Sequence, residues 1–157
     1  VSGSRARPGD AVLVSGHMGD HGVAIMSLRE NLEFGTSIRS DTAALHGLVA
    51  AMLAEVPGLH VLRDPTRGGL ATTLNEIARQ SGAGIVIDEA RIPVRGEVHA
   101  ACEFLGLDPL YVANEGKLVA ICAGEDARRL LAAMQAHPLG RDAAVIGEVI
   151  EDEHAFV

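Results

Sequence analysis

The sequence predicts an α/β (α+β) sandwich, in which about five helices pack against a mixed β-sheet. Short apolar and β-branched segments alternate along the chain with segments of helical periodicity, which indicates this class. A second observation is an Asn-Glu-Gly turn between two apolar runs. Such a turn is typical of a β-hairpin and favours a mixed sheet over a purely parallel one. With 157 residues, 48% of them hydrophobic, the chain is expected to form one domain over 1–157.

The first half of the chain is expected to contain two strands and three helices. Leucine, valine and methionine recur at helical spacing between positions 45 and 53, and Pro57-Gly58 ends that helix. Ser81-Gly82 ends the next one. In order, the predicted elements are a strand over 11–15, a glycine-rich turn over 16–22, a helix over 23–30, a polar loop over 31–39, a long helix capped by Ser40 or Asp41, a strand over 59–62 and a helix over 69–79.

The second half continues the alternation. Gly-Ile-Val-Ile-Asp at 84–88 has the β-branched composition of a buried strand. Gly106 and Pro138 mark the ends of two further helices. In order, the predicted elements are a strand over 84–88, a helix over 97–105, two strands over 110–113 and 117–122 around the turn 114–116, a helix over 126–136 and a strand over 143–150.

Composition excludes several classes of function. The formal net charge of -8 argues against nucleic-acid binding, which needs a basic face, and 3% aromatic residues leave few stacking platforms. No apolar run is long enough to span a membrane, and no secretion signal begins the chain. Cys102 and Cys122 stand among small apolar residues, which predicts buried, reduced thiols in a cytoplasmic protein. Because the chain lacks an initiator methionine, we expect it to be part of a longer protein.

The segment Arg63–Leu70 is the most informative part of the sequence. It joins a predicted strand to a predicted helix, and the unpaired N–H groups of a helix's first turn attract anions, phosphates above all. Its two glycines would let a ligand approach the backbone. The alternative is an ordinary helix start in which Asp64 or Thr66 is the cap. The phosphate-binding or substrate-binding residues predicted here are Asp64, Thr66, Arg67, Gly68 and Gly69.

The glycine-rich turn over 16–22 is a second candidate, with a glycine at every third position. Its spacing is similar to that of phosphate loops, although it matches neither the dinucleotide fingerprint nor a Walker loop. His17 and His21 have the spacing of metal ligands on a helix. The glycines disfavour a helix there and no third ligand is visible, so no metal site is predicted. Either Asp20 or His21 caps the following helix, or the loop lines a substrate cleft with His17, Asp20 and His21.

The third candidate is Tyr111–Lys117. Asparagine and glycine suit a tight turn, in which Glu115 and Lys117 would simply be solvated. In the functional interpretation, a carboxylate at the tip of a hairpin, at the sheet edge where helix N-termini gather, is well placed as a general base. Its neighbour Asn114 would orient an amide or a phosphate oxygen. The predicted catalytic residues are therefore Glu115 and Asn114.

Four motifs together resemble one known family. In chain order they are Arg7-Pro8-Gly9-Asp10, Ser15-Gly16 with Gly19-Asp20-His21-Gly22, Arg63 to Leu70, and Ala113-Asn114-Glu115-Gly116-Lys117. They are similar to the C-terminal domain of the hydrogenase-maturation carbamoyl dehydratases (HypE), in the PurM-like or aminoimidazole ribonucleotide synthetase-like superfamily. The resemblance covers nearly the whole chain. It implies a fold like that of the PurM C-terminal domain, and a lyase.

The resemblance implies that 1–157 is one domain of a larger enzyme. In the family, an N-terminal domain binds most of ATP and magnesium and forms the homodimer, and a C-terminal tail ends in Pro-Arg-Ile-Cys. Both would be absent from this chain. A carboxamide carried on the tail cysteine is dehydrated with ATP to a thiocyanate, which supplies the cyanide ligand of nickel–iron hydrogenase. The implied partners are the carbamoyltransferase HypF and the HypC–HypD iron-delivery scaffold.

Within this resemblance each motif has an expected role. Glu115 would be the base and Asn114 would orient the substrate, while the helix start from Thr66 to Gly69, with Arg67, would cradle the transferred phosphate. Lys117 would either stabilise the ionised form of Glu115 or be solvated. Without the nucleotide-binding domain and the cysteine tail, the isolated chain is expected to fold but not to hydrolyse ATP.

Two alternatives remain from the sequence. One is another PurM-like ATP-dependent enzyme, of the aminoimidazole ribonucleotide or selenophosphate synthetase type, although the relatives in those branches carry other residues at the Arg63–Leu70 turn. The other is a module that docks a partner and has no catalysis of its own, with the acidic end at 151–153 or the loop at 31–39 as its surface.

Overall fold

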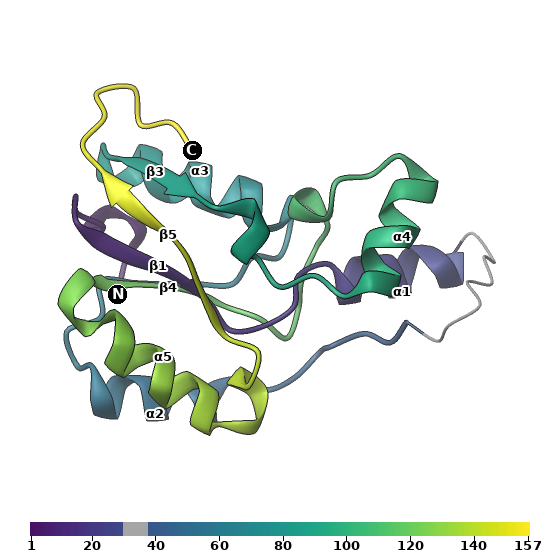
Figure 1. The fold of residues 1–157 in the computed structure, drawn as a ribbon, viewed down its shortest axis with the longest axis horizontal. Helices are drawn as coiled ribbons and strands as arrows, with labels where there is room; N and C mark the ends of the chain where they lie inside the picture. The colour runs from purple at the N-terminus through teal and green to yellow at the C-terminus, as the bar shows by residue number, and fades with distance from the viewer. Residues whose placement is uncertain (30–37) are drawn as a thin grey trace.

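A five-stranded β-sheet runs through the middle of the molecule (Figure 1). The computed structural model describes residues 1–29 and 38–157. The strands are β1 (Asp10–Val14), β2 (Val61–Arg63), β3 (Gly84–Ile87), β4 (Val119–Ala123) and β5 (Ala144–Ile150). Their order across the sheet is β2-β4-β1-β5-β3.

The sheet is antiparallel in every described pair, so the mixed sheet predicted from the sequence is corrected. Strands β1, β2 and β3 run in one direction, and the helical connections between them would allow parallel pairing. However, β4 lies between β2 and β1, and β5 lies between β1 and β3. The two strands that come last in the chain therefore separate the first three, and each strand contacts only neighbours of opposite direction.

Five α-helices surround the sheet, in agreement with the predicted class. They are α1 (Asp20–Arg29), α2 (His46–Glu55), α3 (Gly69–Ser81), α4 (Gly96–Leu105) and α5 (Ala127–Ala136). Helices α2 and α5 lie together on one side of the sheet and α3 lies on the other, while α1 and α4 pair beside one end of it (Figure 1). None of the described helices is long and apolar enough to cross a lipid bilayer.

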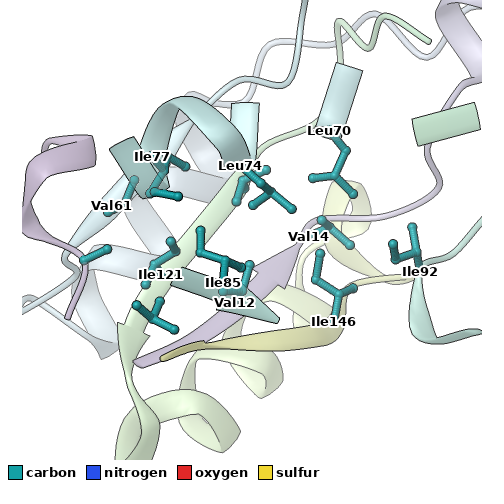
Figure 2. Packing of buried hydrophobic residues seen from close by; sticks show 14 of the residues in the cluster. Val12, Val14, Val61, Leu70, Leu74, Ile77, Ile85, Ile92, Ile121 and Ile146 are labelled. Atoms are coloured by element: carbon teal, nitrogen blue, oxygen red, sulfur yellow. The ribbon is translucent and has the colours of Figure 1, made fainter. Parts of the chain in front are cut away.

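The alternation of side chains along β1 builds two cores. Val12 and Val14 belong to the cluster under α3, whereas Ala11 and Leu13 belong to the cluster with α2 and α5, as the two-residue period of a strand requires. Figure 2 shows the first cluster, in which side chains from one face of α3 point onto the sheet. Its labelled members are Val12, Val14, Val61, Leu70, Leu74, Ile77, Ile85, Ile92, Ile121 and Ile146.

A third, smaller core joins α1 to α4. Its buried members are Val23, Val98, Ala101, Cys102 and Val112. Because Val112 comes from the chain just before the Asn-Glu-Gly turn, this core fixes α1 and the glycine-rich turn next to that segment. It therefore positions two of the candidate motifs.

One predicted element and the start of another are wrong. Positions 110–113 form no strand, because Pro109 starts a 3-10 turn over Pro109–Tyr111 and the Asp108 carboxylate accepts from the Leu110 N–H at 2.8 Å. The predicted hairpin is therefore absent. The helix expected to begin after Ser40 or Asp41 begins at His46, with no side-chain cap. The polar loop predicted over 31–39 lies largely outside the described residues.

Candidate functional site

Asn114 holds the three candidate motifs together. Its side chain is completely buried. The Oδ1 atom accepts from the Gly19 N–H at 2.8 Å, and Nδ2 donates to the carbonyls of Pro65 and Val112, each at 3.1 Å. The Asn114 N–H also donates to the Pro65 carbonyl at 3.1 Å. The glycine-rich turn, the Arg63–Leu70 turn and the Asn-Glu-Gly turn therefore meet around one amide.

Glycines allow these turns to approach one another. Gly69 has a positive φ of 65°, and a Cβ atom there would lie 2.7 Å from both the Tyr111 carbonyl carbon and the Val112 carbonyl oxygen. A Cβ on Gly116 would collide with the Asp41 carbonyl. The Gly69 position therefore faces neighbouring backbone, whereas Gly68, which is also predicted to bind the ligand, is exposed.

We predict that Gly69→Ala lowers the free energy of unfolding by about 2 kcal/mol, because it adds both a strained φ and a steric conflict. Gly82 offers a matched control. It has a similar φ of 67° at the other end of α3, but nothing lies within 4 Å of its Cβ position. Gly82→Ala should therefore cost only the strain, about 1 kcal/mol. Urea denaturation measures both values, and equal costs would contradict the packing role given to Gly69.

The N-terminus of α3 has no side-chain cap. Gly68, in the left-handed conformation, occupies the N-cap position, so the alternative that Asp64 or Thr66 caps the helix is wrong. Asp64 and Arg67 are exposed and Thr66 is half-buried. In the part of the chain that the structure describes, no hydrogen bond or ion pair engages these three side chains. They are available to a ligand at the end of α3 that carries partial positive charge.

Glu115 stands exposed next to buried Asn114, and among the described residues its carboxylate has no hydrogen bond or ion pair. Lys117 does not pair with it. The Lys117 Nζ lies 2.8 Å from Asp41 Oδ2, and these two side chains are only 13% and 9% exposed. Lys117 therefore neither stabilises ionised Glu115 nor is simply solvated. Its ammonium compensates the charge of Asp41 and links the 38–45 segment to the Asn-Glu-Gly turn.

The glycine-rich turn places its polar residues in three different environments. Asp20 is already the first residue of α1, and its buried Oδ2 accepts from Arg95 Nε at 3.0 Å. Burial raises the pKa of Asp20, against the opposing effect of the Arg95 guanidinium. His17 Nδ1 lies 3.3 Å from Asp142 Oδ2.

His21 has its own partner. Its Nδ1 lies 2.8 Å from the hydroxyl of Ser40. His17 and His21 therefore face different groups and do not form the pair of ligands that their spacing suggested. Among residues 1–29 and 38–157, no group of three or more His, Cys, Asp and Glu side chains is arranged to hold a metal ion.

Residues 7–157 match the protein family described as AIR synthase related protein, C-terminal domain. The chain belongs to this family. Over its full 157 residues the chain is also 73% identical to the carbamoyl dehydratase HypE of Cupriavidus necator, of which it covers 45%. This AIR synthase related domain thus spans about half the length of the curated relatives that it matches.

Solved structures resemble the domain closely. A crystal structure of a HypE–HypF complex superposes with a TM-score of 0.94 at 49% identity, over 97% of this chain and 50% of that chain. A crystal structure of HypE in complex with ATP superposes with a TM-score of 0.93 at 54% identity, over 99% of this chain and 46% of that chain. The predicted resemblance to HypE, and the predicted fold, are confirmed.

Sequence reasoning missed two residues of the AIR synthase related domain that shape its polar site, Arg95 and Asp41. Arg95 donates a hydrogen bond to Asp20, which lies 75 positions earlier in the chain. In the sequence Arg95 falls between a proline and a helix start and belongs to no recognisable motif. Asp41 was interpreted as a helix cap, whereas it pairs with Lys117. No local pattern identifies either residue, because each acquires its role only through a partner distant in the chain.

The two cysteines of the domain are buried and free, as predicted. Burial is the main cause that raises the pKa of the Cys102 thiol, and it raises that of Cys122 to about 11. At neutral pH, about one Cys122 side chain in ten thousand would then be a thiolate.

We predict that Ellman's reagent leaves both thiols unmodified in the native domain and titrates both in urea. Rapid reaction of the native protein would contradict the inert role given to them.

Proposed function

We propose that this chain is the C-terminal domain of an ATP-dependent carbamoyl dehydratase that acts in the maturation of nickel–iron hydrogenases. In the full-length protein, a carboxamide on a C-terminal cysteine is converted to a thiocyanate, which is the source of the cyanide ligand on the hydrogenase iron. The observation that carries the proposal is the 73% identity to the Cupriavidus necator HypE over every residue of the chain. The three motifs also meet at the buried side chain of Asn114, which gives a physical reason why they occur together in one chain.

The reaction needs a way to remove an amide oxygen, which is a poor leaving group. The carboxamide oxygen attacks the γ-phosphorus of ATP, ADP leaves, and one N–H proton is lost, giving an S-linked carboximidate whose oxygen carries the phosphoryl group. Removal of the second N–H proton then forms the C≡N bond as phosphate departs. The sum is thiocarboxamide plus ATP to thiocyanate plus ADP and phosphate, with the amide oxygen ending in the phosphate.

The described residues supply two parts of this chemistry. Glu115, exposed and without an ion pair, takes the nitrogen proton as general base. The uncapped N-terminus of α3, with Thr66, Arg67 and Gly68, cradles the phosphoryl group through its N–H groups and the guanidinium. Asn114 has its amide engaged by protein, so in this proposal it positions Glu115 and the surrounding turns instead of binding the substrate.

The remaining parts come from outside this chain. ATP and magnesium bind mainly to the N-terminal domain of the full-length protein, which also forms the homodimer. Because a HypE structure contains ATP and another contains HypF, we propose ATP as a substrate and the carbamoyltransferase HypF as a partner, with HypC–HypD as the acceptor. We place the protein in the cytoplasm. Asp20 and His21 line two different cavities and His17 lies against Asp142, so this proposal assigns no shared cleft to them, and Asp64 stands exposed before the start of α3.

The test uses the full-length protein with its carbamoyltransferase, carbamoyl phosphate and ATP, and follows the intact mass of the C-terminal peptide. The proposal predicts a carbamoyl adduct that loses the mass of one water only when ATP is present. An adduct that forms but never loses water with ATP would contradict the dehydratase step. If no adduct forms, the hydrogenase assignment itself fails, and synthetase substrates of the wider family become the next to test.

A further inference from the structure

A polar cavity of about 320 Å³ lies between the start of α1, the segment 38–41 and the start of α4. Its polar lining consists of Asp20, Arg39, Ser40, Asp41, Arg95 and Glu97. Three of these, Asp20, Asp41 and Arg95, belong to the ion pairs described above. Because Asp41 also contacts Gly116 and Lys117, the cavity adjoins the turn that carries Glu115.

The buried carboxylate of Asp20 holds the Arg95 guanidinium at the wall of this cavity. Asp20, whose side chain is 6% exposed, binds only the Nε of Arg95, at 3.0 Å, while the Arg95 side chain is 47% exposed. Within the described residues, neither Nη group of Arg95 has a hydrogen bond, and Arg39 forms no ion pair. A guanidinium fixed through Nε with both Nη groups free has the geometry that binds phosphate or carboxylate with two parallel hydrogen bonds.

The same cavity contains acceptors that lack donors. Among the described residues, the buried Oδ1 atoms of Asp20 and Asp41 have no hydrogen-bond partner, whereas Asp41 Oδ2 faces the Lys117 ammonium. The Lys117 ammonium compensates the charge of Asp41 at 2.8 Å. Buried acceptors without partners are costly, so such a cluster favours a ligand that brings N–H or O–H donors.

We infer that this cavity binds a phosphorylated group that also carries an N–H donor, with Arg95 on the phosphate and the Asp20 and Asp41 carboxylates toward the N–H. Glu97 adds a carboxylate to the wall, which disfavours a ligand that is only an anion. None of the residues of the phosphoryl cradle proposed at the start of α3 lines this cavity, so the inference concerns a second site and does not rest on the proposed function. Asp20 then has two roles, because its Oδ2 fixes Arg95 and its Oδ1 faces the N–H of the ligand.

Protection of Arg95 from phenylglyoxal tests the site in the full-length protein. The reagent modifies accessible guanidinium groups, and peptide mass spectrometry reports the modification rate of each arginine. With ADP present to occupy the nucleotide site, inorganic phosphate at about four times its Kd should slow modification of Arg95 about fivefold. Arg128, exposed on α5, is the internal control and should not change. An unchanged Arg95 rate, or equal slowing of Arg128, would overturn the inference.

A second probe tests the donor part of the site. Phosphoramidate, which adds N–H donors to a phosphoryl group, should protect Arg95 at about a tenfold lower concentration than inorganic phosphate. Asp41→Asn should remove this preference without abolishing protection by phosphate. If the preference is absent from the parent protein or survives in the variant, the role of the carboxylates is wrong. The readout needs no carbamoyl transfer, so loss of the dehydratase reaction with intact protection would refute the proposed function and not the site.

Discussion

Replacing Asn114 with alanine is expected to lower the free energy of unfolding by about 4 kcal/mol. The substitution removes a completely buried amide and leaves the Gly19 N–H and the Val112 carbonyl without partners in a site closed to water. It also disconnects the glycine-rich turn from the Arg63–Leu70 turn, because the Asn114 side chain bridges Gly19 and Pro65. Urea denaturation of the chain, followed by circular dichroism, measures the effect.

Asn75 provides the matched control for this prediction. It is a half-buried asparagine on α3 whose Nδ2 donates one hydrogen bond, to the Ala71 carbonyl at 2.9 Å. Asn75→Ala should cost less than about 1 kcal/mol, because solvent replaces that hydrogen bond. If the two variants were equally stable, Asn114 would not hold the turns together, and the positioning role given to it in the proposed mechanism would fail.

Glu115→Gln is expected to slow dehydration of the carbamoyl adduct about a thousandfold, or about 4 kcal/mol in activation free energy. Glutamine keeps the shape of the side chain but cannot accept the nitrogen proton. Because Glu115 is exposed and has no ion pair with described residues, the variant should retain the stability of the parent chain. Single-turnover conversion of a preformed adduct in the full-length protein measures the rate.

The control for Glu115 is Glu125→Gln, at an exposed glutamate just before α5. It should leave the dehydration rate unchanged, and carbamoyl transfer to the cysteine should proceed in both variants. A Glu115→Gln protein that dehydrates its adduct at the parent rate would remove Glu115 from the proposed mechanism. A variant that no longer accepts the carbamoyl group would instead point to a role in docking the carbamoyltransferase.

The fold was largely predictable because its elements are encoded by local patterns. All five helices and the strands over 84–87 and 144–150 follow from periodicity and from glycine and proline boundaries. The errors have tertiary causes. Residues 110–113 have strand-like composition, yet Pro109 starts a 3-10 turn and Val112 packs into the core between α1 and α4. The order of strands depends on insertion of β4 and β5 between earlier strands, which no local pattern contains.

The candidate site was predictable at the level of motifs but not of contacts. The Arg63–Leu70 turn and the Asn-Glu-Gly turn were identified because glycine, charge and element boundaries coincide there, and the structure brings them together. The part played by Asn114 could not be foreseen, because an asparagine in a turn is usually solvated and its burial depends on Gly19 and Pro65, both distant in sequence. The same reason applies to Arg95, which precedes α4 and whose partner Asp20 begins α1.

If ATP activates the amide oxygen by phosphorylating it, that oxygen ends in inorganic phosphate, and an isotope label can follow it there. The full-length protein would be carbamoylated with a group that carries heavy oxygen at its carbonyl, then given ATP, and the label would be located by mass spectrometry. Phosphorylation followed by elimination places the heavy oxygen in inorganic phosphate, with one labelled phosphate for each thiocyanate formed. Heavy oxygen released as water, with unlabelled phosphate, would show that ATP does not phosphorylate the amide oxygen.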